Sequence, residues 1–407
     1  MPRGLRAGVR AWGTALILLI SGCGTVPGQA LPAMAPADLA RLNIGPFEGK
    51  PVDRAPVVDD RLGVFQIESR RMLGSLVAPY EVDADLTDPL GTHLLALGEA
   101  ALYAEYGANL PPQFQPVLER NYLISGALTA RSNANPRTLK GLTLGILRFP
   151  SDALAQTATI ELDAATGAFK PDRHPVGVPN HPDARASAAA DDRKGYAYAA
   201  RGPFVVLAMV TIPVSDVNSL ADQFKRVLDR QLPRLESLTP TPVDDILDLP
   251  TNPDAIMRRV LPTSTEATDL EVPRQTVGVY DPAAHLHYER DGATLKQVFA
   301  DTGVDLVARN AGIVYRTRDL AAAFRLQHAL TALGRDDEAI GNPPGVADAK
   351  CVKLDTSAPP LGTQYLCAVV HGRYVAVVGN RAKVGGGLDA TLYQRAAAQY
   401  SILAKSA

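Results

Sequence analysis

The sequence predicts an α+β fold made of two related two-layer sandwiches, in which helices cover one face of an antiparallel sheet. Two observations lead to this prediction. The same order of elements, a strand, a helix, a meander of about three strands and a closing helix, occurs in both halves of the 407-residue chain. The helical stretches carry one apolar stripe each, and such a helix buries its stripe against one face of a sheet.

The opening strand and helix of each half follow the same pattern. GILRFPSDALAQTATIELDAA begins at Gly145, and GIVYRTRDLAAAFRLQHALTAL begins at Gly312. Each reads as a short strand followed by a helix that opens near an aspartate, Asp152 or Asp319. Apolar residues then recur at spacings of three and four. These are Leu154, Ala158, Leu162 and Ala165 in one half and Ala323, Leu326, Leu330 and Leu333 in the other.

A hairpin and an amphipathic helix close each half. YAYAARGPFVVLAMV (196–210) and YLCAVVHGRYVAVVG (365–379) predict hairpins with turns at Arg201-Gly202 and His371-Gly372, where glycine supplies a positive φ. The closing helices use Val217, Leu220, Phe224, Val227 and Leu235, and Leu388, Leu392, Ala396, Tyr400 and Leu403. The region from 59 to 130 is additional, with a helix expected over 92–107 and a strand over 121–132.

The N-terminus has the pattern of a secretion signal. Three arginines and no acid precede a run of roughly ten mostly apolar residues, which is too short for a bilayer-spanning helix of about 20. Ile20-Ser21-Gly22-Cys23 resembles the lipobox of bacterial lipoproteins. The resemblance implies cleavage after Gly22 and a diacylglycerol on the Cys23 sulfur. The alternative is an ordinary secretory signal with an incidental cysteine.

Acyl chains on Cys23 would hold the protein on the extracytoplasmic face of the cell membrane. Each buried methylene contributes about 0.8 kcal/mol, so two or three chains anchor stably. The longest other apolar run, Phe204–Ile212, reads as a strand. We therefore expect a protein that is anchored to the membrane and does not span it.

Prolines divide the chain into segments. We expect a signal peptide over 1–22, a proline-rich tether over 23–58, an N-terminal α+β domain over 59–237, a linker over 238–253 and a C-terminal α+β domain over 254–407. Regularly spaced prolines favour a semi-extended chain, which suits a tether.

Charge and cysteine content narrow the classes of function. Without residues 1–22 the chain carries 38 basic and 43 acidic residues, a formal net charge of −5. This balance argues against a nucleic-acid partner, which requires clustered cations. Cys351 and Cys367 flank the Pro359-Pro360 turn region, and a hairpin folded there would place them opposite one another as a disulfide. A metal or redox pair lacks CxxC spacing and a nearby histidine cluster.

Metal and anion sites have only weak signals. His285 and His287 would face one side of a strand, but zinc needs three or four ligands, so a polar strand face is preferred. Gly385–Gly387 before the last helix could bind an anion, although a flexible loop is the preferred interpretation. Asp83 and Asp85 could bind a cation or lie in a solvated loop.

Known catalytic motifs are missing from the sequence. It contains no G-x-S-x-G, S-x-x-K, Walker loop or H-E-x-x-H. His174 and His181 lie in a proline-rich loop and are expected to be exposed. We therefore assign no catalytic residue, no metal ligand and no cofactor.

Several stretches together resemble a family of two-domain actinobacterial lipoproteins from mycolic-acid envelopes, which is known only as a domain of unknown function. The matching stretches are the lipobox, LARLNIGPFEGKP, SRRMLGSLVAPYEVDADL, TVGVYDPAAHLHYE and GIVYRTRDLAAAF, with the paired cysteines. The resemblance implies a cell-envelope location and supplies no catalytic residues.

Three functional hypotheses follow. The first is a non-enzymatic envelope lipoprotein that binds a hydrophobic molecule, a lipid or a partner protein, between its two halves or along an exposed sheet face. The second is an envelope hydrolase or lipid-modifying enzyme with an unrecognised site. The third is a structural scaffold of the envelope.

Overall fold

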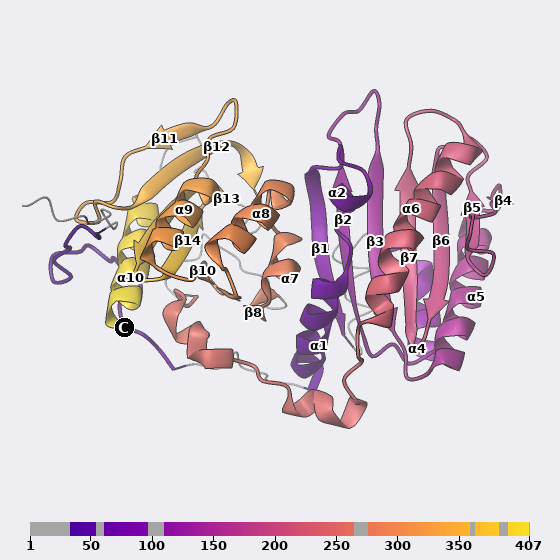
Figure 1. Ribbon diagram of the computed structural model, residues 1–407, viewed down its shortest axis with the longest axis horizontal. Coiled ribbons are helices and arrows are strands. Elements are labelled where there is room, and N and C mark those ends of the chain that lie inside the picture. Colours follow the sequence, from indigo (N-terminus) through magenta and orange to yellow (C-terminus); the bar gives the residue numbers. More distant parts are fainter. Residues whose placement is uncertain are drawn as a thin grey trace, which may run out of the picture. The chain divides into compact units, whose positions relative to one another are not determined.

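The computed structural model describes residues 33–53, 61–96, 110–263, 276–358, 363–381 and 390–406. Ala33–Ala407 form one compact unit. We call residues 61–237 the N-terminal domain and residues 254–406 the C-terminal domain. Each is built around one seven-stranded sheet whose strand pairs are antiparallel (Figure 1). The prediction of an α+β chain with two related domains is confirmed.

The sheet of the N-terminal domain has the strand order β1-β2-β3-β7-β6-β5-β4. Its strands are β1 (Asp88–Ala96), β2 (Ser125–Ser132), β3 (Gly141–Arg148), β4 (His174–Pro175), β5 (Arg185–Ala188), β6 (Lys194–Arg201) and β7 (Phe204–Thr211).

The sheet of the C-terminal domain has the order β8-β9-β10-β14-β13-β12-β11, which repeats the first sheet strand for strand. Its strands are β8 (Gly278–Tyr280), β9 (Leu306–Arg309), β10 (Gly312–Arg316), β11 (Glu338–Ile340), β12 (Lys350–Ala358), β13 (Thr363–His371) and β14 (Tyr374–Asn380). The repeat therefore includes β1 and β2, which correspond to β8 and β9. The helix expected over 92–107 is wrong for residues 92–96, which complete β1, and residues 97–107 lie outside the described residues.

The helices of the N-terminal domain are α1 (Arg61–Ser75), α2 (Pro79–Val82), α4 (Gln115–Arg120), α5 (Asp152–Phe169) and α6 (Val217–Glu236), with a 3-10 turn η1 (Pro112–Phe114). The segment between the domains forms η2 (Val243–Asp248) and leads into η3 (Pro253–Arg259). The C-terminal domain adds α7 (Pro282–Leu286), α8 (Gly292–Thr302), α9 (Leu320–Leu330) and α10 (Thr391–Lys405).

Helices cover both faces of each sheet, so the expectation that they cover one face is wrong. Val205 and Leu207 of β7 pack in the cluster that contains α5, whereas Val206 and Ala208 pack in the cluster that contains α6. In the C-terminal domain α9 packs against one face of β13 and β14, and α10 packs against the opposite face. The physical reason is visible in the strand sequence, because an apolar run without alternation is buried on both faces.

The predicted hairpins are present, with each turn one residue later than expected. Arg201 still pairs with Phe204, and His371 still pairs with Tyr374. The turn residues are therefore 202–203 and 372–373, and the two glycines have φ of 55° and 56°. The positive φ that motivated the prediction is confirmed.

Cys351 and Cys367 form the predicted disulfide. They are directly paired residues of β12 and β13, with their Cα atoms 4.1 Å apart. The Pro359-Pro360 turn itself lies outside the described residues, as do the predicted signal peptide and Cys23.

Residues 33–53, within the predicted tether, are not a free spacer. Leu42 and Phe47 are buried in the same apolar cluster as Leu392 and Ala396 of α10. We call residues 33–53 the strap, because this segment lies along the C-terminal domain although it precedes the N-terminal domain in sequence.

Among the described residues, no helix is both long and apolar enough to cross a bilayer.

Candidate functional site at the domain junction

Apolar side chains of both domains share one core at the junction. Leu73 of α1 and Leu76, which follows that helix, belong to the same buried cluster as Ala284 and Leu286 of α7. These side chains therefore pack the two domains against each other.

A buried acid–base cluster lies behind this apolar contact. His285 Nε2 is 2.9 Å from Glu289 Oε1 and 3.2 Å from the Tyr315 hydroxyl, which donates to the same carboxylate oxygen at 2.6 Å. Burial lowers the pKa of His285, although its hydrogen bond to Glu289 acts in the opposite direction. Burial raises the pKa of Tyr315 well above its usual value. Because His285 is fully buried, this cluster is positioned to hold the fold and not to meet a substrate.

His287 faces a different partner. Its Nε2 donates to the carbonyl oxygen of Leu76 at 3.1 Å, and its own carbonyl accepts from Thr92 Oγ1 at 2.9 Å. Burial, with the nearby Arg131, lowers the pKa of His287 to about 4, so the ring is neutral at pH 7. The polar strand face expected for His285 and His287 is wrong, because both are buried at α7 and its C-terminal end. Across the described residues no group of three or more His, Cys, Asp or Glu side chains is arranged to hold a metal ion.

Arg131 of β2 links the two domains through backbone carbonyls. Its guanidinium donates to the carbonyl oxygens of Glu289 at 2.5 Å and Arg290 at 3.2 Å, and to that of Thr87 at 2.6 Å. The same group lies 5.2 Å from the centre of the Tyr80 ring. These hydrogen bonds hold β2 of one domain against the segment between α7 and α8 of the other.

A pocket of about 360 Å³ opens beside this contact. Both domains contribute to its wall, the N-terminal domain with the end of α1, α2 and the end of α6, and the C-terminal domain with α7, the residue after it and α8. The polar and charged residues that line it are Ser75, Tyr80, Glu81, Arg234, Ser237, His287 and Lys296.

One carboxylate organises the charges of this junction pocket. Glu81 Oε2 is 2.8 Å from Arg234 Nη2 and 2.7 Å from Lys296 Nζ, so cations from two domains meet on one oxygen. Burial raises the pKa of Glu81, but the hydrogen bonds from Lys296, Arg234 and the Ala78 amide outweigh it and bring it to about 2. Tyr80 stays protonated, because burial raises its pKa to about 12. The pocket therefore carries two cations and one anion at neutral pH.

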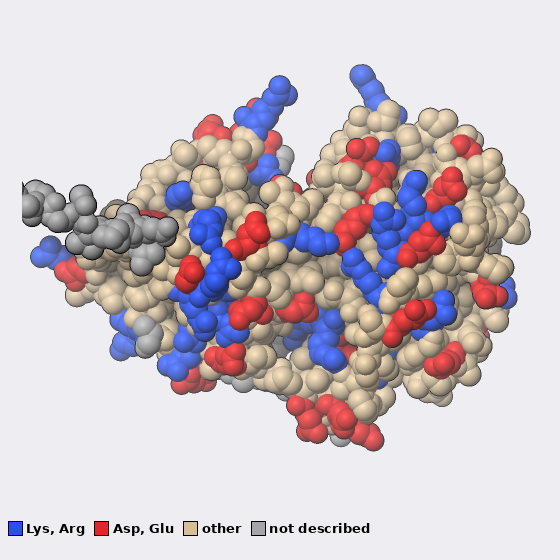
Figure 2. Space-filling view, in the orientation of Figure 1, with Lys and Arg blue, Asp and Glu red and all other residues tan. Residues whose placement is uncertain are grey.

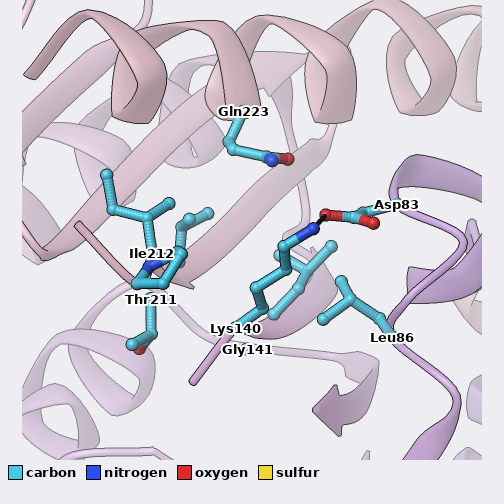
Figure 3. Close-up of a pocket in the computed structure, with 10 residues that line it drawn as sticks. Asp83, Leu86, Lys140, Gly141, Thr211, Ile212 and Gln223 are labelled. Atoms are coloured by element: carbon cyan, nitrogen blue, oxygen red, sulfur yellow. Dashed lines mark hydrogen bonds and ion pairs between the residues drawn. The ribbon is translucent and has the colours of Figure 1, made fainter. Parts of the chain in front are cut away.

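A second pocket in the N-terminal domain explains the Asp83 and Asp85 pair. Lys140 Nζ lies 3.0 Å from Asp83 and 2.6 Å from Asp85, so the cation held there is a lysine of the same chain. Figure 3 shows the ammonium directed at Asp83, with Gln223 of α6 across the cavity. The volume is about 30 Å³, which leaves room for little more than water.

The remaining predicted residues are distributed as follows. His174 is 46% exposed and 3.0 Å from Asp192, whereas His181 is only 17% exposed and 2.8 Å from Asp229. Exposure was thus predicted correctly for His174 and overestimated for His181. Gly385–Gly387 lie outside the described residues.

Sequence reasoning missed the junction pocket altogether. Its lining residues come from separate segments near positions 74–81, 234–237, 283–287 and 296. No spacing connects these segments, and only the packing of the two domains brings them together.

Comparisons with known proteins complete the description. A family model described as "Domain of unknown function (DUF7373) N-terminal" matches residues 56–251, and the corresponding C-terminal model matches residues 256–406. No curated protein matches. The extracellular domain of PknH from Mycobacterium tuberculosis matches at 11% identity and a TM-score of 0.30, over 45% of this chain and 98% of that one. A TM-score this low supports no inference.

Proposed function

The chain belongs to the DUF7373 family, both of whose domains it carries, and from this premise we propose that it is a lipid-anchored protein of the cell envelope that binds a small anionic ligand in the junction pocket. The observation that carries the proposal is the convergence of Arg234 and Lys296, from different domains, on the single carboxylate of Glu81.

The size and charge of the pocket define the ligand class. A volume of about 360 Å³ is at the lower end of small-molecule sites, which favours a compact molecule over an acyl chain. Two cations exceed one carboxylate, so the local field favours a negative charge. Leu76 and Leu286 add apolar wall beside the charges. A phosphate or carboxylate compound with a short apolar part fits this combination.

The chemistry of the wall favours binding over catalysis. A nucleophile needs an adjacent general base that is free to accept a proton. His287 already uses Nε2 to donate to the Leu76 carbonyl, and the Glu81 carboxylate is neutralised by two cations. These groups are suited to fixing a ligand in one orientation.

The membrane attachment is argued from the residues of the N-terminus. A basic segment, a short apolar run and Ser21-Gly22-Cys23 supply the features that lipid modification requires. Acylation of Cys23 would keep the binding site at the membrane of the envelope. A protein without such an anchor would diffuse away and be diluted.

Calorimetric titration tests the ligand proposal with two probes, inorganic phosphate and glycerol 3-phosphate. Removing one cation near the bound anion should weaken binding about tenfold, so Lys296→Gln and Arg234→Gln should each lose affinity. Glu81→Gln should strengthen binding, because it removes the competing carboxylate.

The matched control is Lys353→Gln, which removes a half-buried lysine paired with Glu338 of the edge strand β11 of the other sheet. The control should bind like the unmodified protein. Equal affinities for Lys296→Gln, Glu81→Gln and the control, or no saturable binding of either probe near 1 mM, would overturn the anionic-ligand proposal.

A further inference from the structure

The strap is part of the core of the C-terminal domain. Leu42 and Phe47 are 9% and 6% exposed, and both belong to the cluster formed with α10. The Arg395 guanidinium lies 5.0 Å from the centre of the Phe47 ring. A segment with side chains buried in this way is fixed to the domain and not loosely laid against it.

Polar contacts fix the far end of the strap. The carbonyl oxygen of Gly49 accepts from Ser401 Oγ at 2.8 Å and from Lys405 Nζ at 3.0 Å, both on α10. Gly45 has a φ of 55°, and a Cβ there would overlap the side-chain amide of Gln394. The local turn of the strap therefore requires glycine.

The beginning of the strap lies at the β13–β14 turn. The Gly372 amide contacts the Met34 sulfur at 3.1 Å, and the Ala35 amide donates to Asp348. The chain therefore joins the C-terminal domain at its residues 34 and 35, before the N-terminal domain begins. Arg373 is exposed at the same turn.

The distance along the chain from Cys23 to this turn is short. Ala33 lies ten positions after Cys23, and a chain of that length spans at most about 35 Å when fully extended. If flexible, it has a root-mean-square span of about 17 Å. A lipid on Cys23 would therefore keep the β13–β14 turn near the bilayer.

From these contacts we propose that the strap couples the lipid anchor to the C-terminal domain, so that the β13–β14 turn faces the phospholipid surface and the N-terminal domain is attached to the membrane only through the C-terminal domain. The proposal rests on the lipid anchor proposed above. The membrane is then the partner of the β13–β14 turn. The sequence order, in which the N-terminal domain follows the tether, would instead place the N-terminal domain next to the anchor.

Energy transfer from single cysteines to a headgroup acceptor tests this orientation. The two probe positions are matched arginines in exposed turns, Arg373→Cys at the β13–β14 turn and Arg137→Cys at the β2–β3 turn. The lipidated full-length chain is labelled and placed in phosphatidylcholine–phosphatidylglycerol vesicles that contain a rhodamine-labelled lipid. Transfer should be clearly stronger from position 373 than from position 137.

A second variant changes only the length of the tether. Inserting about 20 Gly/Ser residues after Pro32 raises the root-mean-square span from about 17 to about 30 Å, so transfer from position 373 should fall. This insertion alters no described residue and leaves folding intact. Releasing the strap by Leu42→Asp with Phe47→Asp should give the same loss of transfer from position 373.

Two results would overturn the proposed orientation. One is energy transfer from position 137 that equals or exceeds the transfer from position 373, and the other is transfer from position 373 that does not change when the tether is lengthened. Failure of the anchor itself gives a different result. In that case the mass of the protein lacks diacylglycerol and neither position shows transfer.

Discussion

Gly74 of α1 faces the carboxylate of Asp281 so closely that a Cβ at position 74 would lie 2.5 Å from Asp281 Oδ2. Asp281 is the N-cap of α7, where its side chain accepts from the Ala284 amide at 2.8 Å. A glycine of one domain thus gives room to the capping residue of the other, which is how α1 and α7 approach one another.

Replacing Gly74 with alanine should destabilise the fold by about 1–3 kcal/mol, because the new methyl group must displace the capping carboxylate. The matched control is Gly167→Ala in α5, where a Cβ meets nothing within 4 Å. Alanine there should stabilise by up to about 1 kcal/mol through helix propensity. Urea denaturation measures both, and equal effects of the two substitutions would contradict this description of the junction.

Breaking the buried ion pair of Glu68 and Arg148 should be strongly destabilising. Arg148 Nη1 is 2.5 Å from Glu68 Oε1, and the side chains are 5% and 2% exposed. Arg148→Met leaves a buried carboxylate short of one cation, which should cost about 3 kcal/mol.

The control for this pair is Arg120→Met, which breaks an exposed contact with Glu161 and should cost less than about 1 kcal/mol. Thermal unfolding compares the two variants. A loss for Arg148→Met no larger than that for Arg120→Met would contradict the expected penalty of leaving the Glu68 carboxylate buried without this cation. Because Arg148 also donates to the Thr241 carbonyl, the substitution should also increase proteolysis in the segment 238–253.

His287 predicts how stability depends on pH. Burial and the nearby Arg131 lower its pKa to about 4 in the folded protein, against the ordinary histidine value of 6.5. The unfolded chain therefore binds more protons between these two values. Stability should be constant above about pH 6.5 and fall as the pH decreases toward 4, by an amount on the order of 3 kcal/mol.

His287→Gln keeps a donor for the Leu76 carbonyl and cannot be protonated. The free energy of unfolding of this variant should depend less on pH between 6.5 and 4 than that of the unmodified protein. If the free energy of unfolding has the same slope against pH in both proteins, groups other than His287 cause the pH dependence.

The disulfide should stabilise the C-terminal domain. Cys351 and Cys367 are separated by 16 positions in sequence, and closing such a loop contributes about 3 kcal/mol in the chain-entropy model. A double variant, Cys351→Ser with Cys367→Ser, should lose about this much in chemical denaturation. Dithiothreitol should reproduce the loss in the unmodified protein and have no effect on the variant.

Local patterns predicted much of the fold. Apolar spacing located the helices around Phe224 and Ala396, glycine chemistry located the turns at Gly202 and Gly372, and the hairpin argument located the disulfide. Each of these features is set by residues close in sequence. The strand at 92–96 was missed because a short apolar run is ambiguous between helix and strand.

The junction could not be predicted in the same way. Glu81, Arg234 and Lys296 meet only after two separately patterned domains have packed, and nothing near each residue marks its partners. The strap was missed because proline spacing indicates an extended backbone but does not show whether Leu42 and Phe47 find a surface to bury against.

Attachment through Cys23 is tested most directly by the intact mass of the protein extracted from the membrane fraction, compared with that of a Cys23→Ala variant. The account predicts that the unmodified protein starts at Cys23 and carries a diacylglyceryl group. The Cys23→Ala variant should carry no lipid, whether or not residues 1–22 are removed. A chain that retains residues 1–22, carries no lipid and remains outside the membrane fraction would contradict it.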